Sequence, residues 1–435
     1  TSPTNTVMKN KINRTGMLPV LLGMAAMPAF AETYSEDATI EKFASDSTVT
    51  NNATITVSSE NRTNYGFTID AGSKVVAGSR YFIMGTGSGP KESEVNIAGT
   101  FEMGSGGEFR LGDDSAGWSA TVNILDGGRL TAAEGTVFNL ANYRGARSVI
   151  NVEKGGEISG LNDINMFDRG NESTQNPVSE LNIMGKVTYF GTLSMGKAAR
   201  DEAKGDVQNS FVTVSDGGTL SGRNLNVASG ALRNNAVLTV KGAGSSASFS
   251  GSIFVGGADA SQTGTLAIHS GASFKSSSTV TLNKYGKIEI ALDSNLGQAQ
   301  GAIFTAPSIT ITTLEGSKSI SLSMSSSSEP GYVEGLSAGD TIDVILFDNL
   351  TAIIVDGVSN DITADMSDAD LQALLSTVMD VNFAGNSYWE AAGMEDVHMK
   401  DGDISLSLTY VPEPAALAAV FGALALAMLA MRKRA

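Results

Sequence analysis

The chain has 435 residues, with 49 glycines and no cysteine, and 29 basic against 46 acidic residues give it a formal net charge of -17. This balance lacks the basic footprint that phosphate recognition needs, so it excludes nucleic acid as a partner. The lack of cysteine excludes disulfide scaffolds, thiol nucleophiles and cysteine-ligated metals. Because only 2 histidines are present, we expect no catalytic residues, no metal site and no cofactor.

The N-terminal region has the three parts of a secretory signal peptide. An apolar run at residues 17–27 is followed by small residues at Ala29 and Ala31, and basic side chains precede it at Lys9, Lys11 and Arg14. This order predicts a signal peptide at residues 8–31, with Ala29 and Ala31 forming the signal-peptidase site. The apolar run is too short to span a bilayer comfortably. Cleavage after Ala31 leaves Glu32 as the mature N-terminus.

The C-terminal region, residues 411–435, has a different three-part order. The motif Pro412, Glu413 and Pro414 precedes an uncharged run of alanines and leucines at residues 415–431. A run of that length is at the lower limit for a transmembrane helix, which we predict here. A basic cluster follows, which the positive-inside rule predicts to lie on the cytoplasmic side: Arg432, Lys433 and Arg434. The simplest interpretation is a tail anchor that is never processed.

This order of motif, short helix and basic terminus resembles the PEP-CTERM sorting domain, over about the last 25 residues. The resemblance implies that Pro412, Glu413 and Pro414 are recognised by an exosortase, a membrane protease thought to cleave near them. It also implies that the residues from Arg432 to Arg434 stop transfer. The setting it implies is a Gram-negative-type envelope, often with biofilm or exopolysaccharide.

The middle of the chain repeats an apolar–polar–apolar triplet at intervals of about 28 residues. A glycine turn follows most copies, as at Gly127 and Gly155, and two further short apolar segments complete the repeat. Outward asparagines and threonines are expected to stack in ladders along such a repeat. The triplets begin at Val95, Val122, Ile150, Leu181, Val212, Leu238 and Leu266.

Three short strands per repeat predict an all-β fold, a right-handed parallel β-helix over residues 90–284. The pattern resembles the β-helical repeats of autotransporter passengers and pectin-lyase-like proteins. An array of β-sandwiches is the alternative fold. We expect residues 32–89 to form an irregular N-terminal β cap of the same stack. Residues 285–410 are expected to form a β-rich second or capping domain, with one helix that starts near Ser367.

Two groups of side chains carry some potential for chemistry. Parallel β-helices host polysaccharide lyases and hydrolases, which need clustered charges on one outward face. Near the repeats, the group that meets this description is Asp163, Asp168 and Arg169. A second group invites a metal interpretation, although a solvated acidic loop explains it better: Glu395, Asp396, His398 and Asp401.

The sequence therefore predicts an exported, non-enzymatic, adhesin-like structural protein of the cell surface or extracellular matrix. Its expected partners are signal peptidase and an exosortase, with extracellular polysaccharide or a second copy on its repetitive face. The alternatives are a secreted polysaccharide-active enzyme and an unprocessed tail-anchored protein. Six of the 29 basic residues and one of the 46 acidic ones lie in the two terminal signals. The segment from Glu32 to Val411 thus keeps 23 basic and 45 acidic residues, a net charge of -22, which discourages binding to anionic polymers.

Overall fold

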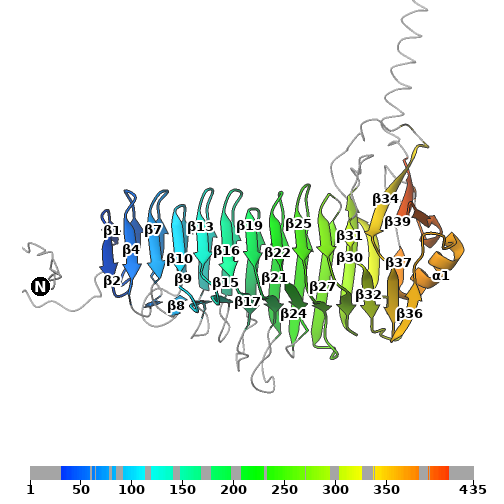
Figure 1. The fold of residues 1–435 in the computed structure, drawn as a ribbon, viewed down its shortest axis with the longest axis horizontal. Helices are drawn as coiled ribbons and strands as arrows, with labels where there is room; N and C mark the ends of the chain where they lie inside the picture. Colours follow the sequence, from blue (N-terminus) through cyan, green and yellow to red (C-terminus); the bar gives the residue numbers. More distant parts are fainter. Residues whose placement is uncertain are drawn as a thin grey trace, which may run out of the picture.

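The computed structural model describes residues 31–410 except 59–60, 64, 78–80, 85–91, 113–118, 141–146, 168–177, 197–206, 230–232, 270, 294–302, 326–336, 338, 382–389 and 391. The chain winds into one long stack of coils whose strands form three sheets, here named A, B and C (Figure 1). Along the stack the strands of each sheet pair in parallel with the preceding and following coil. The fold is an all-β parallel solenoid, as the repeats predict, and the β-sandwich alternative is wrong.

Sheet A contains the repeated triplets, whose first apolar residues form one inward column. The seven side chains pair in register from Val95 to Leu266, and each is at most 1% exposed. Alternation along each strand turns the residues between them outward. The strands are β1 (Glu32–Tyr34), β3 (Ser47–Val49), β6 (Phe67–Ile69), β9 (Glu92–Ile97), β12 (Ser119–Ile124), β15 (Arg147–Val152), β18 (Val178–Ile183), β21 (Gln208–Val214), β24 (Asn234–Val240), β27 (Gln262–His269), β30 (Gly286–Asp293), β33 (Ile320–Ser325) and β37 (Met379–Val381).

Sheet B follows the glycine turn and carries the second apolar point of each repeat. Leu130, Ile158, Val187 and Leu220 lie in register, and Ala247 continues the column although its small side chain hides it in the sequence. The strands are β2 (Ala38–Ile40), β4 (Thr54–Val57), β7 (Lys74–Ala77), β10 (Thr100–Met103), β13 (Arg129–Ala132), β16 (Glu157–Leu161), β19 (Lys186–Tyr189), β22 (Thr219–Gly222), β25 (Ser246–Phe249), β28 (Ser273–Ser276), β31 (Phe304–Thr305), β34 (Thr341–Asp348), β39 (Asp403–Thr409) and β38 (Val397–Lys400).

Sheet C completes each coil and adds two inward residues per strand, such as Leu193 and Met195, which are fully buried. The third apolar segment predicted for the repeats lies in the strands of this sheet. In β17, which pairs with β14 and β20, the inward residues are Ile164 and Met166. The strands are β5 (Asn61–Thr63), β8 (Tyr81–Met84), β11 (Glu108–Leu111), β14 (Val137–Leu140), β17 (Asp163–Met166), β20 (Thr192–Met195), β23 (Asn224–Val227), β26 (Ile253–Val255), β29 (Val280–Leu282), β32 (Ser308–Ile311), β35 (Ala352–Val355) and β36 (Val358–Asp361).

The turn from sheet A to sheet B requires glycine for two different reasons. Gly127 has a φ of +75°, in the left-handed region that side chains disfavour. Gly128 has an ordinary φ, but a β-carbon there would overlap the carbonyl oxygen of Ile97 in the preceding coil. The predicted Gly-Gly turn is thus confirmed, and it lets consecutive coils approach closely enough to pair.

Residues 32–89 join the same three sheets, and the stack is plugged at this end by an aromatic side chain. Phe43 is fully buried, and its ring stacks on Phe67 with centroids 4.7 Å apart. Phe67 in turn stacks on Phe101 at 5.9 Å. Phe43 therefore covers the apolar columns where the next coil would otherwise lie.

The sheets continue past residue 284, where the sequence pattern changes. Strands β30, β31 and β32 pair in parallel with β27, β28 and β29, and β33, β34 and β35 add a further layer. The sequence placed a boundary at 284/285 because the triplet and its glycine turn end there. The inward positions persist without the turn, so the solenoid extends into the predicted capping domain.

The C-terminal end is closed by antiparallel strands and a helix (Figure 1). Strand β39 pairs antiparallel with β34, β38 with β39, and β36 with β35. The predicted helix is α1 (Asp368–Val378), and the Ser367 hydroxyl accepts a hydrogen bond from the Asp370 amide at its start. A short 3-10 helix, η1 (Met394–Asp396), precedes β38. Buried Leu371 and Leu375 pack α1 against the core.

Candidate functional site

Most residues of the predicted terminal signals lie outside the described residues. This holds for Ala29, for the motif Pro412 to Pro414, for the helix at 415–431 and for the basic cluster Arg432 to Arg434. Ala31 is described, and it is exposed immediately before β1. In the described part of the chain, no helix combines the length and apolar character needed to cross a bilayer.

Asp163, the first of the candidate catalytic carboxylates, begins β17 and accepts hydrogen bonds at the corner before that strand. Its Oδ1 accepts a hydrogen bond of 2.7 Å from the Thr192 amide, and its Oδ2 accepts one of 2.9 Å from Asn162 Nδ2. Asp168 and Arg169 lie outside the described residues. Both oxygens of Asp163 are thus engaged, and the bond to Thr192 links two adjacent coils.

His398 contacts a carboxylate that the sequence grouping missed, Asp343. Its Nε2 lies 3.5 Å from Asp343 Oδ1, while Lys400 Nζ approaches Oδ2 to 2.6 Å. Burial acts to raise the pKa of Asp343, but hydrogen bonds from Lys400 and Ser407 and the nearby positive charges lower it overall. Asp343 and His398 are 55 residues apart in the chain, and the pairing of β34, β39 and β38 brings them together. The ion pairs and hydrogen bonds of Asp343 therefore connect these three strands.

The outer face of sheet A carries the predicted ladder of amide side chains. Asn123 Nδ2 donates to Asn96 Oδ1 at 2.9 Å, Asn151 to Asn123 at 2.8 Å, and Asn182 to Asn151 at 3.0 Å. The same outward row continues with Thr213 and with Thr239 in the following coils. In these bonds Asn151 and Asn182 use one of their two amide hydrogens, whereas Asn123 donates both, to Asn96 and to Glu94. The face therefore offers polar groups at one spacing per coil.

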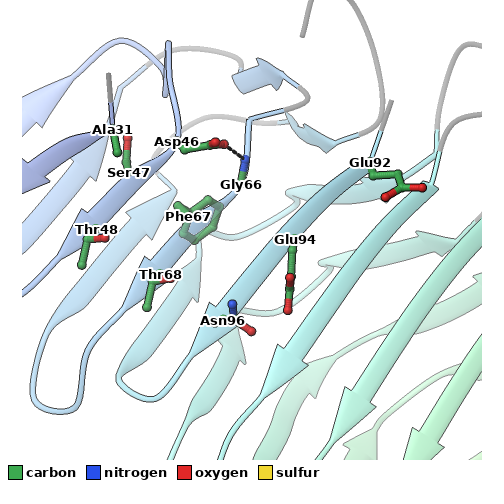
Figure 2. A pocket seen from close by; sticks show the side chains of 10 residues that line it. All are labelled: Ala31, Asp46, Ser47, Thr48, Gly66, Phe67, Thr68, Glu92, Glu94 and Asn96. Carbon is green, nitrogen blue, oxygen red and sulfur yellow. Dashed lines mark hydrogen bonds between the residues drawn. The ribbon is translucent and has the colours of Figure 1, made fainter. Parts of the chain in front are cut away.

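A hollow of about 380 Å³ opens at the N-terminal end of this face (Figure 2). It lies over Gly66, which directly precedes β6 and contacts both Asp46 in the preceding coil and the Glu94 backbone in the following coil. Gly66 has no side chain to fill the row. Asp46 Oδ1 accepts the Gly66 amide at 2.8 Å, and Glu94 Oε1 accepts Asn123 Nδ2 at 2.9 Å. The remaining lining residues are Ala31, Ser47, Thr48, Phe67, Thr68, Glu92 and Asn96.

The lining of the hollow is polar and acidic. It contains three carboxylates, from Asp46, Glu92 and Glu94, together with hydroxyl and amide groups, and the described residues that line it include no basic side chain. Such a surface favours neutral or positively charged groups, and the volume is at the lower end of small-molecule sites. The sequence could not reveal it, because a lone Gly66 outside the recognised repeats gives no signal.

Comparison with protein-family models, with curated proteins and with solved structures finds no significant match to this chain. The class of protein therefore rests on the fold and the surface themselves. The chain forms a long parallel β-solenoid with an open, polar outer face and capped ends. Among the described residues, no three side chains of the metal-binding types converge on one point.

Proposed function

We propose that this protein is an exported, non-enzymatic structural protein that displays its solenoid on the cell surface or in the extracellular matrix. The outer face of sheet A carries the proposal, because it presents a polar row that continues from Thr48 through the asparagine ladder to Thr239. An extended polymer can lie along such a face and meet the same groups in every coil. Adhesin-like contact with extracellular polysaccharide, or with a second copy, follows from that geometry.

The net charge of the molecule limits the kinds of polysaccharide that it can bind. The net charge of -22 between Glu32 and Val411, together with Asp46, Glu92 and Glu94 in the hollow, repels anionic chains. Neutral polysaccharides, or ones with positively charged groups, are therefore the proposed ligands. Signal peptidase, acting at Ala29 and Ala31, and an exosortase, acting near Pro412 to Pro414, are the proposed processing partners. The proposed location is the cell surface or the extracellular space of a cell with a Gram-negative-type envelope.

The processing of both ends tests the proposal. In a host that carries an exosortase, intact-mass spectrometry should find a chain that begins at Glu32 and lacks Ala435. The Glu413→Gln variant should still end at Ala435. The matched upstream control, Glu390→Gln, should lose Ala435 as the unaltered chain does. A natural sequence that is recovered still ending at Ala435 would contradict sorting and support a plain tail anchor. A chain that keeps residues before Ala31 would contradict export.

The enzymatic alternative predicts a different result. A polysaccharide lyase or hydrolase on this fold would shorten glycans, and the activity would depend on Asp163. Incubating the protein with neutral and acidic glycans, followed by binding and size analysis, should show binding of the neutral glycans and shortening of neither kind. Depolymerisation that Asp163→Asn abolishes would overturn the structural proposal, provided that the variant keeps the folded circular dichroism spectrum despite losing a corner contact.

A further inference from the structure

A column of small inward residues lies where each coil passes from sheet C into sheet A. The members pair in register from one coil to the next along β9, β12, β15, β18, β21, β24 and β27. They are buried close to the carbonyl ends of the sheet C strands, and the Ser148 hydroxyl donates to the Leu111 carbonyl at 3.1 Å. The column contains Ser93, Ala120, Ser148, Ser179, Ser210, Ala236 and Gly264.

Within three of these coils, neighbouring inward residues carry polar atoms without protein partners. The hydroxyls of Ser179 and Ser210 and the oxygens Gln208 Oε1 and Asn234 Oδ1 are buried with no hydrogen bond. The four residues are between 92% and 100% buried. Native proteins rarely leave buried polar atoms unpaired, so a cluster of four in adjacent coils indicates a bound polar molecule.

The orientation of Asn234 defines what the missing partner must supply. Its Nδ2 donates to the Met195 carbonyl at 2.9 Å, so Oδ1 is the oxygen that is left unpaired. Gln208 pairs directly with Asn234 in the next strand, and its unpaired atom is also an amide oxygen. Two acceptors on neighbouring coils require two donors, and the adjacent Ser210 hydroxyl can donate in return.

We propose that one water molecule is bound inside the solenoid between β18, β21 and β24. It donates hydrogen bonds to Gln208 Oε1 and to Asn234 Oδ1 and accepts one from the Ser210 hydroxyl. Ser179 pairs with Ser210 in the adjacent coil. Water fits because it is small, uncharged and supplies two donors. The bound water holds together the same three strands that carry Asn182, Thr213 and Thr239 on the outer face.

Crystallography and hydrogen exchange together test this site. A high-resolution crystal structure should show density within hydrogen-bond distance of Gln208, Ser210 and Asn234, and rubidium soaking should give no anomalous peak there. Ser210→Ala should speed amide exchange in β21 and β24 about tenfold, because one bond to the water is lost. The matched outward control, Ser221→Ala in β22, should leave exchange in those strands unchanged.

The opposite results overturn the proposal. If the Ser210 hydroxyl has no partner in the folded protein, its removal relieves a buried unpaired group, and exchange slows or stays the same. Absent density in the unaltered protein contradicts the site independently of any variant. A rubidium peak at the three residues would identify a monovalent cation site in place of water.

Discussion

Gly222→Ala is expected to lower the free energy of unfolding by about 3 kcal/mol, because the added carbon has no space. A β-carbon at Gly222 would overlap the ring of Tyr189 from the preceding coil. That ring is 3% exposed, and its hydroxyl donates to the Asn224 carbonyl at 2.9 Å. Moving the ring away therefore costs both core packing and a buried hydrogen bond.

The measurement is guanidinium unfolding, with hydrogen exchange of β19 and β22 to localise the loss. Gly104→Ala is the matched control, since its β-carbon would lie 3.5 Å from the Ala77 carbonyl oxygen, an ordinary contact. We expect that control to change stability by less than about 1 kcal/mol. In a Tyr189→Leu background the Gly222→Ala cost should fall sharply. Equal costs in both backgrounds would contradict the overlap as the cause.

Leu238→Asp is expected to unfold the coils around β24, at a cost of about 4 kcal/mol or more. Leu238 is fully buried and lies in register between Val212 and Leu266. A carboxylate there loses its hydration without gaining a partner. Because each coil supports its neighbours, exchange should accelerate in β21 and β27 as well.

Thr239→Asp is the matched control, one residue further along the same strand and on the outer face. It introduces the same side chain into water, so we expect a loss of about 1 kcal/mol or less, from strand propensity. Circular dichroism and hydrogen exchange give the comparison. Similar losses at the two positions would mean that the inward and outward faces are assigned in the wrong register.

The sequence predicted the parts of this fold whose side chains repeat. Val95, Val122 and Ile150 mark sheet A because large apolar residues recur at one place in each coil. Ala247 escaped notice because a small side chain fills the same inward position equally well. The continuation past 284 escaped for a related reason, since parallel pairing needs only an inward residue such as Ile288 or Ile309, and no glycine turn.

The candidate surface was predictable only in part. The outward asparagines of the triplets suggested a ladder, and their hydrogen bonds confirm it. The hollow depends on Gly66 lying between Asp46 and Glu94, three residues brought together by register and not by spacing in the chain. The contact of His398 with Asp343 likewise follows from antiparallel strands, which no local motif encodes.

The continuous stack of coils is the central claim, and distances between spin labels test it most directly. The chain has no cysteine, so introduced pairs label cleanly. Thr48, Thr239 and Ser321 share one outward row of sheet A, the last of them beyond residue 284. With strands about 4.8 Å apart, Thr48→Cys with Thr239→Cys should give about 34 Å, and Thr48→Cys with Ser321→Cys about 48 Å. Distances that do not grow with strand number would contradict the solenoid and the surface built on it.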